Sequence, residues 1–414
     1  MRRRATTAAG VTAAAVLTLG LVLPHVAGPQ PLPTLRNGAE WRDRAPFAPA
    51  GLGGRLLRPV EDSVWLARGR APLDPRRRRL VLGALADLHG LTGESGAVAA
   101  GPDAPWAYAW PRDSAFVAAA FAVSGHDDDA WRVWRFLARV QRPDGGFEAR
   151  YRLDGSGPPD DRPRQTDGAG WALWGLEATR VATGARVLPG DLRVLRDRAV
   201  RFALAQTRDG RRLPDATPDY WEVPERDVTL GTAAPLAAGL EAAARSLAAE
   251  GSSAASSRCA AAARRLRSLV RTTFGPTYER YGSSGGLDAG VAVLMPPFTV
   301  LDDAAAVRAW ERYPVLALRE AGGLAPGAAW KSDGVSWTPE TALVAYTAAA
   351  SGRVELAERW MGWLEEHCTA WGSLPEKVLP DGRPAGPAPL AWTAALVVLT
   401  EHELEARRAD LPAS

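Results

Sequence analysis

The segment DDAWRVWRFLARVQ, residues 128–141, shows the pattern on which the whole chain is built. Apolar side chains recur every three or four residues along it, and its arginines lie off that stripe. Such spacing predicts an amphipathic helix with one buried face. The stripe consists of Ala130, Val133, Trp134, Leu137 and Val140, and it is repeated by Leu192, Leu195, Ala199 and Phe202 and by Leu356, Trp360, Trp363 and Leu364.

Outward from this segment, the same periodicity predicts twelve helices. The run VAVLM within the eighth would suit a strand equally well, and loops rich in Gly, Pro and Asp separate the helices. The pattern indicates an all-α fold, and six successive pairs are the number found in an (α/α)6 barrel, or six-hairpin toroid. The expected helices span residues 78–88, 112–124, 128–141, 166–183, 191–207, 229–248, 256–274, 288–296, 302–320, 338–351, 353–368 and 389–405.

Composition excludes several classes of protein. With 414 residues, 46% of them hydrophobic, the chain has ample apolar content for a core and is neither disordered nor collagen-like. No stretch reaches about 20 uninterrupted apolar residues, which excludes a protein of many membrane spans. The net charge of +3 equals the contribution of Arg2, Arg3 and Arg4 alone. We therefore expect no nucleic-acid partner, since binding one requires a concentrated basic face.

The N-terminus has the features of a targeting segment. Three arginines precede the apolar run AAGVTAAAVLTLGLVL, and small residues follow it. Residues 1–28 are therefore interpreted as a secretory signal peptide or an uncleaved membrane anchor. Residues 29–74, rich in Pro, Gly and Arg, are interpreted as a linker or strap before a helical domain at 75–410. The domain would lie outside the cytoplasm, secreted or anchored to the outer face of the membrane. There Cys259 and Cys368 either pair or remain buried thiols.

The segment before the second expected helix carries residues of an unusual pattern. The segment WAYAWPRDS, residues 106–114, places three aromatic rings at a spacing of two before an Arg-Asp pair at a helix start. Rings stack on sugars and paired charges bind hydroxyl groups, so this segment suits a carbohydrate. The alternative is that Asp113 only caps the helix and the rings are core.

Two further loops each place a carboxylic acid near a tryptophan. They are PDYWE, ending at Glu222, and WGSLPE, ending at Glu376. Glycoside hydrolysis needs two carboxylates that flank one bond, and an apolar ring can hold one of them protonated. The alternative is that each is an exposed loop glutamate without a catalytic role.

Other catalytic sets are missing from the sequence. The five histidines show neither H-x-x-x-H nor H-E-x-x-H, there are two cysteines, and no G-x-S-x-G or G-K-[ST] occurs. The segment HDDD at 126–129 is better explained as a solvated helix start than as a cation site. We expect neither a metal nor a cofactor.

From about Gly96 to Leu404 the chain resembles glycoside hydrolase family 15, the glucoamylase-like enzymes. The resemblance rests on ordered motifs, namely YAWPRD (108–113), QTDG (165–168), WE (221–222), the stretch 287–303, GSLPE (372–376) and PLAWT (389–393). It implies an (α/α)6 barrel and exo-acting, inverting hydrolysis of α-glucosides. It also implies that Glu222 is the general acid, held protonated beside Trp221, and that Glu376 is the general base. The substrate-binding residues that it suggests are Tyr108, Trp110, Arg112, Asp113, Trp221, Trp106, Arg312, Trp337 and Trp392.

The chain departs from the family in several places. Trp106 stands where the family usually has a tyrosine whose hydroxyl stabilises the developing oxocarbenium ion, so that hydrogen bond would be lost. Asp161 or Arg162 stands near the position where starch-active fungal members keep a tryptophan for the next subsite. Arg312 and Trp337 resemble two substrate-contacting residues of the family, but they are spaced more widely in the sequence. We expect neither the N-terminal β-sandwich of many bacterial members nor a starch-binding module. Short oligosaccharides or trehalose are therefore favoured over raw starch, with the protein acting as a monomer.

Two other functions remain open from the residues. One is a catalytically silent, glycan-binding (α/α)6 protein, which the Trp106 departure favours. The other is a polysaccharide lyase or unsaturated glucuronyl hydrolase of the same fold. An acidic sugar needs a basic pocket, and the motif loops offer mainly Arg112 and Lys377.

Overall fold

The computed structural model describes residues 59–70 and 72–409, and the side chains from residue 63 onward. The predicted signal peptide or anchor, residues 1–28, and most of the segment 29–74 lie outside the described residues. Within the described part the helices are α2 (Pro59–Arg68), α3 (Arg78–Leu91), α4 (Pro111–Val123), α5 (Asp127–Val140), α6 (Asp167–Ala182), α7 (Gly190–Gln206), α8 (Leu230–Ala249), α9 (Ser253–Phe274), the 3₁₀ helix η1 (Ala289–Leu294), α10 (Ala304–Leu316), α11 (Thr338–Ala350), α12 (Val354–Glu366) and α13 (Ala391–Ala409).

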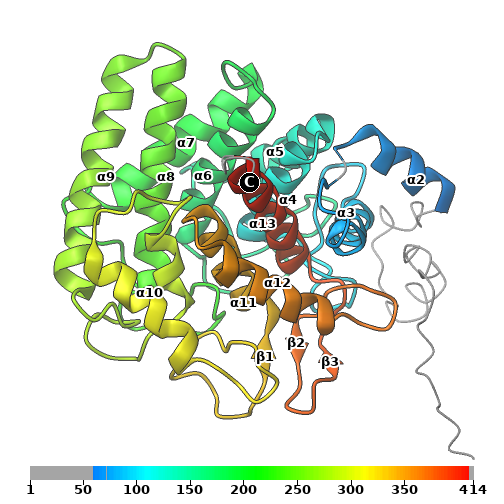
Figure 1. Ribbon diagram of the computed structural model, residues 1–414. Coiled ribbons are helices and arrows are strands. Elements are labelled where there is room, and N and C mark those ends of the chain that lie inside the picture. The colour runs from blue at the N-terminus through cyan, green and yellow to red at the C-terminus, as the bar shows by residue number, and fades with distance from the viewer. Residues whose placement is uncertain (1–58, 71, 410–414) are drawn as a thin grey trace, which may run out of the picture. The chain divides into compact units, whose positions relative to one another are not determined.

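These helices form a closed double ring (Figure 1). The inner ring runs α4, α6, α8, η1, α11, α13, and α13 packs back against α4. Each inner element packs mainly against one outer helix, in the order α5, α7, α9, α10, α12 and α3. The predicted (α/α)6 barrel is therefore confirmed, and α3 supplies the sixth outer position by packing on the last inner helix.

Inner and outer helices differ in their sequences. In α4 every residue from Pro111 to Ala122 is buried, and the helix is apolar around most of its circumference. In α5 the buried side chains lie on one face, as the stripe predicts. Small residues allow the inner helices to approach closely: a Cβ on Gly170 would lie 2.3 Å from the carbonyl oxygen of Pro235 in α8. Helices buried on all sides are the expected result of such composition.

Eleven of the expected helices are α-helices, and the segment 288–296 differs. It forms the short 3₁₀ helix η1, whose first turn is capped by the Asp288 side chain accepting from the Gly290 amide at 3.0 Å. Pro296 and Pro297 follow one residue after the end of η1 and lack amide hydrogens, so the helix does not continue. One inner position of the barrel is therefore much shorter than the others.

Helix α2 was not predicted, since it falls within the segment interpreted as a linker or strap. Its Trp65 ring stacks between His89 and His126, with ring centroids 4.2 and 3.5 Å away. The Trp65 indole also donates to Asp129 Oδ2 at 2.8 Å. Helix α2 is thus attached to α3 and α5 by one side chain, a contact that local periodicity does not reveal.

Three two-residue strands form a small antiparallel sheet at one end of the ring (Figure 1). The strands are β1 (Ser336–Trp337), β2 (Lys377–Val378) and β3 (Pro384–Ala385), with Trp337 opposite Lys377 and Lys377 opposite Ala385. Strands this short have no detectable alternation in sequence.

No helix in the described residues has the length and apolar character needed to cross a bilayer. Cys259 is buried, Cys368 is half-buried, and both are free thiols. Of the two alternatives left open for the cysteines, the structure shows the unpaired one.

Candidate active site

A cavity of about 340 Å³ lies at the end of the ring where the inner helices begin. It brings together nine of the eleven predicted site residues from segments far apart in the sequence. These are Trp106, Trp110, Arg112, Asp113, Trp221, Glu222, Trp337, Glu376 and Trp392.

The two other predicted residues lie elsewhere. Arg312 is exposed on the outer helix α10, so its predicted contact with substrate in this cavity is wrong. Its neighbour Tyr313 points inward and donates to the carbonyl of Ala325. Tyr108 is half-buried behind the cavity wall, where the Arg150 guanidinium stacks on its ring at 4.5 Å. Tyr108 therefore supports the wall and does not line the cavity.

Arg112 and Asp113 occupy the first turn of α4. The extended backbone of Trp110 and the proline that follows start the helix there, so both side chains face the cavity. Arg112 is held by several partners: it donates to Gln165 Oε1 at 3.1 Å, and its guanidinium lies 5.1 Å from the centroid of the Trp392 ring. Burial opposes the charge on Arg112, but the carboxylates of Asp113 and Asp167 outweigh it and raise the pKa.

Asp113 has an unused hydrogen-bonding atom. Its Oδ2 is buried and has no hydrogen-bond partner, and its closest ion pair is with Arg112 at 3.7 Å. Burial raises the pKa of Asp113 to about 6 against the opposing charge of Arg112. Buried polar atoms are nearly always hydrogen-bonded, so an exception at a cavity wall suggests a ligand as the partner.

The Glu222 loop is anchored by a buried network below the cavity. Asp219 Oδ1 accepts from the Trp221 amide at 2.9 Å and from Arg280 at 2.8 Å. Arg280, fully buried, also pairs with Asp288 at 2.7 Å and with Glu225 at 2.6 Å. The turn leaves Glu222 with a φ of 56°, which is unusual for a residue with a side chain. The position of this glutamate is therefore imposed by the network.

The surroundings of Glu222 differ from those predicted. The Trp221 ring packs on the Arg280 guanidinium, which lies 3.8 Å from the ring centroid, and edge-on against Trp330. Glu222 is exposed and accepts from the Trp110 indole at 3.2 Å, and also from Gln165. Arg112 and Arg162 donate to its two oxygens at 3.5 and 3.2 Å. Glu222 is therefore surrounded by hydrogen-bond donors, and not by the apolar setting beside Trp221 that the sequence led us to expect.

Glu376 also lines the cavity and is 8% exposed. Its amide donates to Pro387 and its carbonyl accepts from Thr338, which fixes it at the start of β2. The Trp106 indole donates to Glu376 Oε1 at 3.2 Å, and Lys377 Nζ lies 2.9 Å from Oε2. Trp106 therefore does not simply forfeit a hydrogen bond at this position, because its N–H makes one to the predicted general base.

Sequence reasoning missed several residues of the cavity wall. Trp330, Arg162 and Glu340 line it without having been named as ligands, and Gln165 was identified only within a helix-start motif. A signal for Glu340 was available, since WTPE at 337–340 resembles WPRD at 110–113. Both motifs begin an inner helix with a proline and place an acid in the first turn. In the described residues no cluster of His, Cys, Asp and Glu could hold a metal ion.

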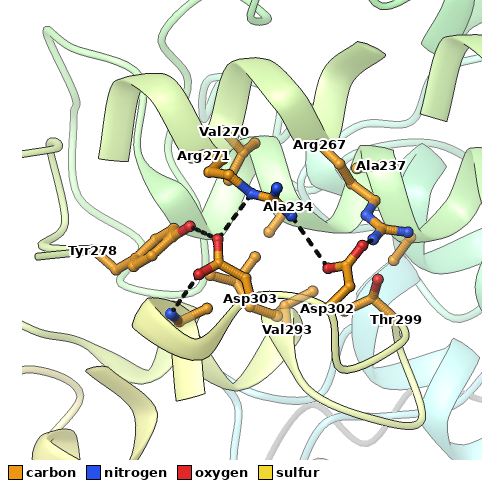
Figure 2. A pocket seen from close by; sticks show the side chains of 13 residues that line it. Ala234, Ala237, Arg267, Val270, Arg271, Tyr278, Val293, Thr299, Asp302 and Asp303 are labelled. Atoms are coloured by element: carbon orange, nitrogen blue, oxygen red, sulfur yellow. Dashed lines mark hydrogen bonds and ion pairs between the residues drawn. The ribbon is translucent and has the colours of Figure 1, made fainter. Parts of the chain in front are cut away.

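A second, smaller cavity of about 40 Å³ lies between α8, α9 and the start of α10. We call it the α9–α10 pocket. Figure 2 shows its charged side chains pointing toward one another. Arg271 pairs with Asp303 at 2.9 Å and with Asp302 at 3.3 Å, while Arg267 binds Asp302 and Tyr278 binds Asp303. The charges of this pocket are used to join two outer helices.

The sequence matches no protein-family model and no curated protein. Solved structures, however, share the architecture. A glycosidase variant in complex with glucose is 23% identical, with a TM-score of 0.70 over 83% of this chain and 98% of its own. A bacterial glucoamylase complexed with acarbose is 17% identical, with a TM-score of 0.69 over 83% of this chain and 58% of its own. Glucoamylase from Saccharomycopsis fibuligera is 14% identical, with a TM-score of 0.63 over 85% and 97%. The chain therefore has the (α/α)6 fold of these glycosidases and glucoamylases.

Proposed function

We propose that this protein is an exo-acting, inverting glycoside hydrolase that releases glucose from the non-reducing ends of α-glucosides. Short α-glucan oligosaccharides or trehalose are the proposed substrates. One observation carries the proposal: Glu222 and Glu376, from distant loops, line one cavity together with Arg112 and Asp113. The likeness in fold to a glycosidase solved with glucose and to glucoamylases supports it.

In this mechanism Glu376 is the general base. The Trp106 indole can only donate a hydrogen bond, and Lys377 is a cation, so both contacts favour the ionised carboxylate. An ionised Glu376 takes a proton from a water molecule as that water attacks the anomeric carbon. Inversion requires the second carboxyl on the opposite face of the sugar, at a separation of about 6.5–9.5 Å.

Glu222 is the proposed general acid, and it must gain a proton before it can give one to the glycosidic oxygen. The cation nearest to its outer oxygen, Arg162, has a side chain 44% exposed and lies on a loop. A sugar that entered the cavity would displace Arg162 and cover Glu222, and removal of water favours the neutral carboxyl. The proposal thus assigns the protonation of Glu222 to the substrate complex.

The side chains proposed to orient the substrate are the Arg112–Asp113 pair and two tryptophan rings. The free Oδ2 of Asp113 and the guanidinium of Arg112 can bind sugar hydroxyls, while Trp110 and Trp392 provide apolar faces. The substrate partner would be an oligosaccharide, with no cofactor. We also propose that the protein acts outside the cytoplasm, as its N-terminal sequence suggests. We propose that it does so as a monomer.

One observation favours a second candidate, a glycan-binding protein without turnover. Two arginines on Glu222 favour its ionised form, and an ionised Glu222 cannot act as an acid. A lyase or hydrolase for acidic sugars is less well supported. The cavity lining contains four acidic side chains and three basic ones, which does not suit an anionic substrate.

The test is proton NMR of the purified protein with maltose, isomaltose, maltotriose and trehalose. New β-glucose from the non-reducing end is the expected first product. If the glucose released first from maltotriose is the α-anomer, the inverting scheme is wrong. Binding by calorimetry without hydrolysis would support the second candidate.

A further inference from the structure

We propose that Glu340 is a substrate-binding residue of the large cavity, and that its carboxyl donates a hydrogen bond to a sugar hydroxyl. This inference deepens the proposed function and rests on it for the identity of the ligand. It assigns a role to a side chain that the mechanism above does not use.

The first ground is the place of Glu340 in the fold. It lies in the first turn of α11, directly after Pro339, and lines the cavity. Helix α11 packs on one side of α13 and α4 on the other. Glu340 and Asp113 thus enter the cavity from corresponding positions of two inner helices, on either side of the one that carries Trp392.

The second ground is an unused polar atom. Glu340 is 2% exposed, and its Oε2 is buried without a hydrogen-bond partner. Glu401, the equally buried glutamate of α13, also keeps its Oε2 unpaired, but Arg408 binds its Oε1 at 2.8 Å, and Glu401 does not line the cavity. A buried carboxyl that faces a cavity without a partner is the arrangement expected of a ligand contact.

The third ground is the charge around Glu340. Burial raises its pKa to about 8 and Glu376 adds to the shift, while a hydrogen bond from its own backbone amide and the charges of Arg112 and Lys377 oppose it. Near neutral pH the carboxyl therefore carries a proton and can donate as well as accept.

This protonation state separates Glu340 from its neighbours. Asp113 and Glu376 offer acceptors to a sugar, and Arg112 offers donors from the start of α4. A neutral Glu340 adds a donor on the α11 side, where a neutral hydroxyl is the natural partner. A cationic amino sugar would instead require Glu340 to lose its proton, and we therefore expect a neutral sugar to bind more tightly near neutral pH.

The test compares Glu340→Gln, which keeps the shape and a donor, with Glu340→Leu, which keeps only bulk. Binding of glucose and maltose is measured by calorimetry from pH 6 to 9, with kcat and KM where turnover occurs. We expect Glu340→Gln to bind within about threefold of wild type and Glu340→Leu to bind about tenfold more weakly. Glu401→Gln, a buried acid in α13 outside the cavity, is the control for loss of a buried carboxyl.

The pH profile supplies an independent readout. Because deprotonation removes the donor, wild-type affinity should fall as the pH rises past about 8, and Glu340→Gln should lose that fall. Equal binding by wild type and Glu340→Leu overturns the inference, and so does an identical pH profile for wild type and Glu340→Gln. If Glu340→Leu does not fold, the pH comparison alone decides.

The outcomes also separate this inference from the proposed function. Wild type that binds glucose in a Glu340-dependent way but hydrolyses nothing contradicts the enzyme proposal and keeps this one. If wild type hydrolyses maltose and Glu340→Leu has no effect, the enzyme proposal is supported and the role of Glu340 is contradicted. A protein that binds none of the sugars contradicts both.

Discussion

The large cavity and the α9–α10 pocket both contain arginines and acidic side chains, and they differ in how those charged groups are paired. In the α9–α10 pocket (Figure 2), two arginines, two aspartates and a tyrosine bind one another. In the large cavity, Asp113 and Glu340 each keep a buried oxygen without a partner. The charged side chains of the α9–α10 pocket thus have partners within the protein, whereas two carboxyl groups of the large cavity keep an oxygen that lacks one. Thr299 Oγ1 is also unpaired in the α9–α10 pocket, so the difference lies in the carboxyl groups: those of the pocket are paired, and two of those in the large cavity each keep an oxygen without a partner.

The largest expected effect is a loss of turnover when either of two glutamates of the large cavity, Glu222 or Glu376, is replaced. Glu376→Gln and Glu222→Gln should each lower kcat about 10²–10⁴-fold, because each removes a proton-transfer group. Their melting temperatures should stay close to that of wild type, since neither side chain joins two helices. Asp215→Asn, in the same loop as Glu222 but paired only with exposed Arg212, is the matched control. Full activity in either glutamine variant would contradict its assigned role.

A smaller loss of turnover is expected when the hydrogen bond from Trp106 to Glu376 is removed. Trp106→Phe keeps an aromatic ring but removes the indole N–H that Glu376 accepts. A hydrogen bond to a charged group contributes about 1.5–3 kcal/mol, so kcat should fall about 10–100-fold. Trp106→Tyr should recover part of the loss. A change in KM alone would show that the ring serves binding and does not position the base.

The α9–α10 pocket should respond in stability and not in turnover. Asp303→Ala removes the ion pair with Arg271 and the cap of α10, whose amides at Ala305 and Ala306 donate to Asp303 at 2.8 and 3.2 Å. We expect a loss of about 1–2 kcal/mol in unfolding free energy, with kcat and KM unchanged. Asp381→Ala, which breaks an exposed pair with Arg383, should change neither.

The same aspartate gives a pH dependence of stability. Burial opposes its charge, but the hydrogen bond from Tyr278 and the amides of α10 outweigh it and lower the pKa of Asp303. A lowered folded-state pKa contributes stability at pH values above the unfolded value of about 3.9, and this contribution disappears as the pH falls further. Denaturant melts between pH 3 and 6 should therefore show a smaller loss on acidification for Asp303→Asn than for wild type. Equal losses would contradict this linkage.

The smallest expected effect concerns Arg162. Its side chain is largely exposed, so its charge on Glu222 is screened. Arg162→Ala should move the basic limb of the pH–activity profile upward by about a few tenths of a pH unit, since a nearby cation favours the ionised glutamate. Arg164→Ala, on the same loop but paired with Asp144, is the control. A larger shift would mean that Arg162 stays on Glu222 when substrate binds.

Sequence reasoning predicted most of the helices because their burial repeats with the helical period. It did not predict η1 as a 3₁₀ helix, nor α2, whose attachment depends on Trp65 reaching His89 and His126. For the site, the motifs named Arg112, Asp113, Glu222 and Glu376, which do line one cavity. Arg312 was misplaced because a short motif does not reveal which face of a helix it occupies.

The sequence by itself thus determined the class of fold and the types of side chain at the starts of the inner helices. Periodicity and helix-start motifs are local properties, and a few neighbouring residues are enough to specify them. Only the tertiary structure decided which atoms remained unpaired. Whether Asp113 and Glu340 keep a free oxygen, and whether Trp106 reaches Glu376, depends on how segments hundreds of residues apart meet at one end of the ring.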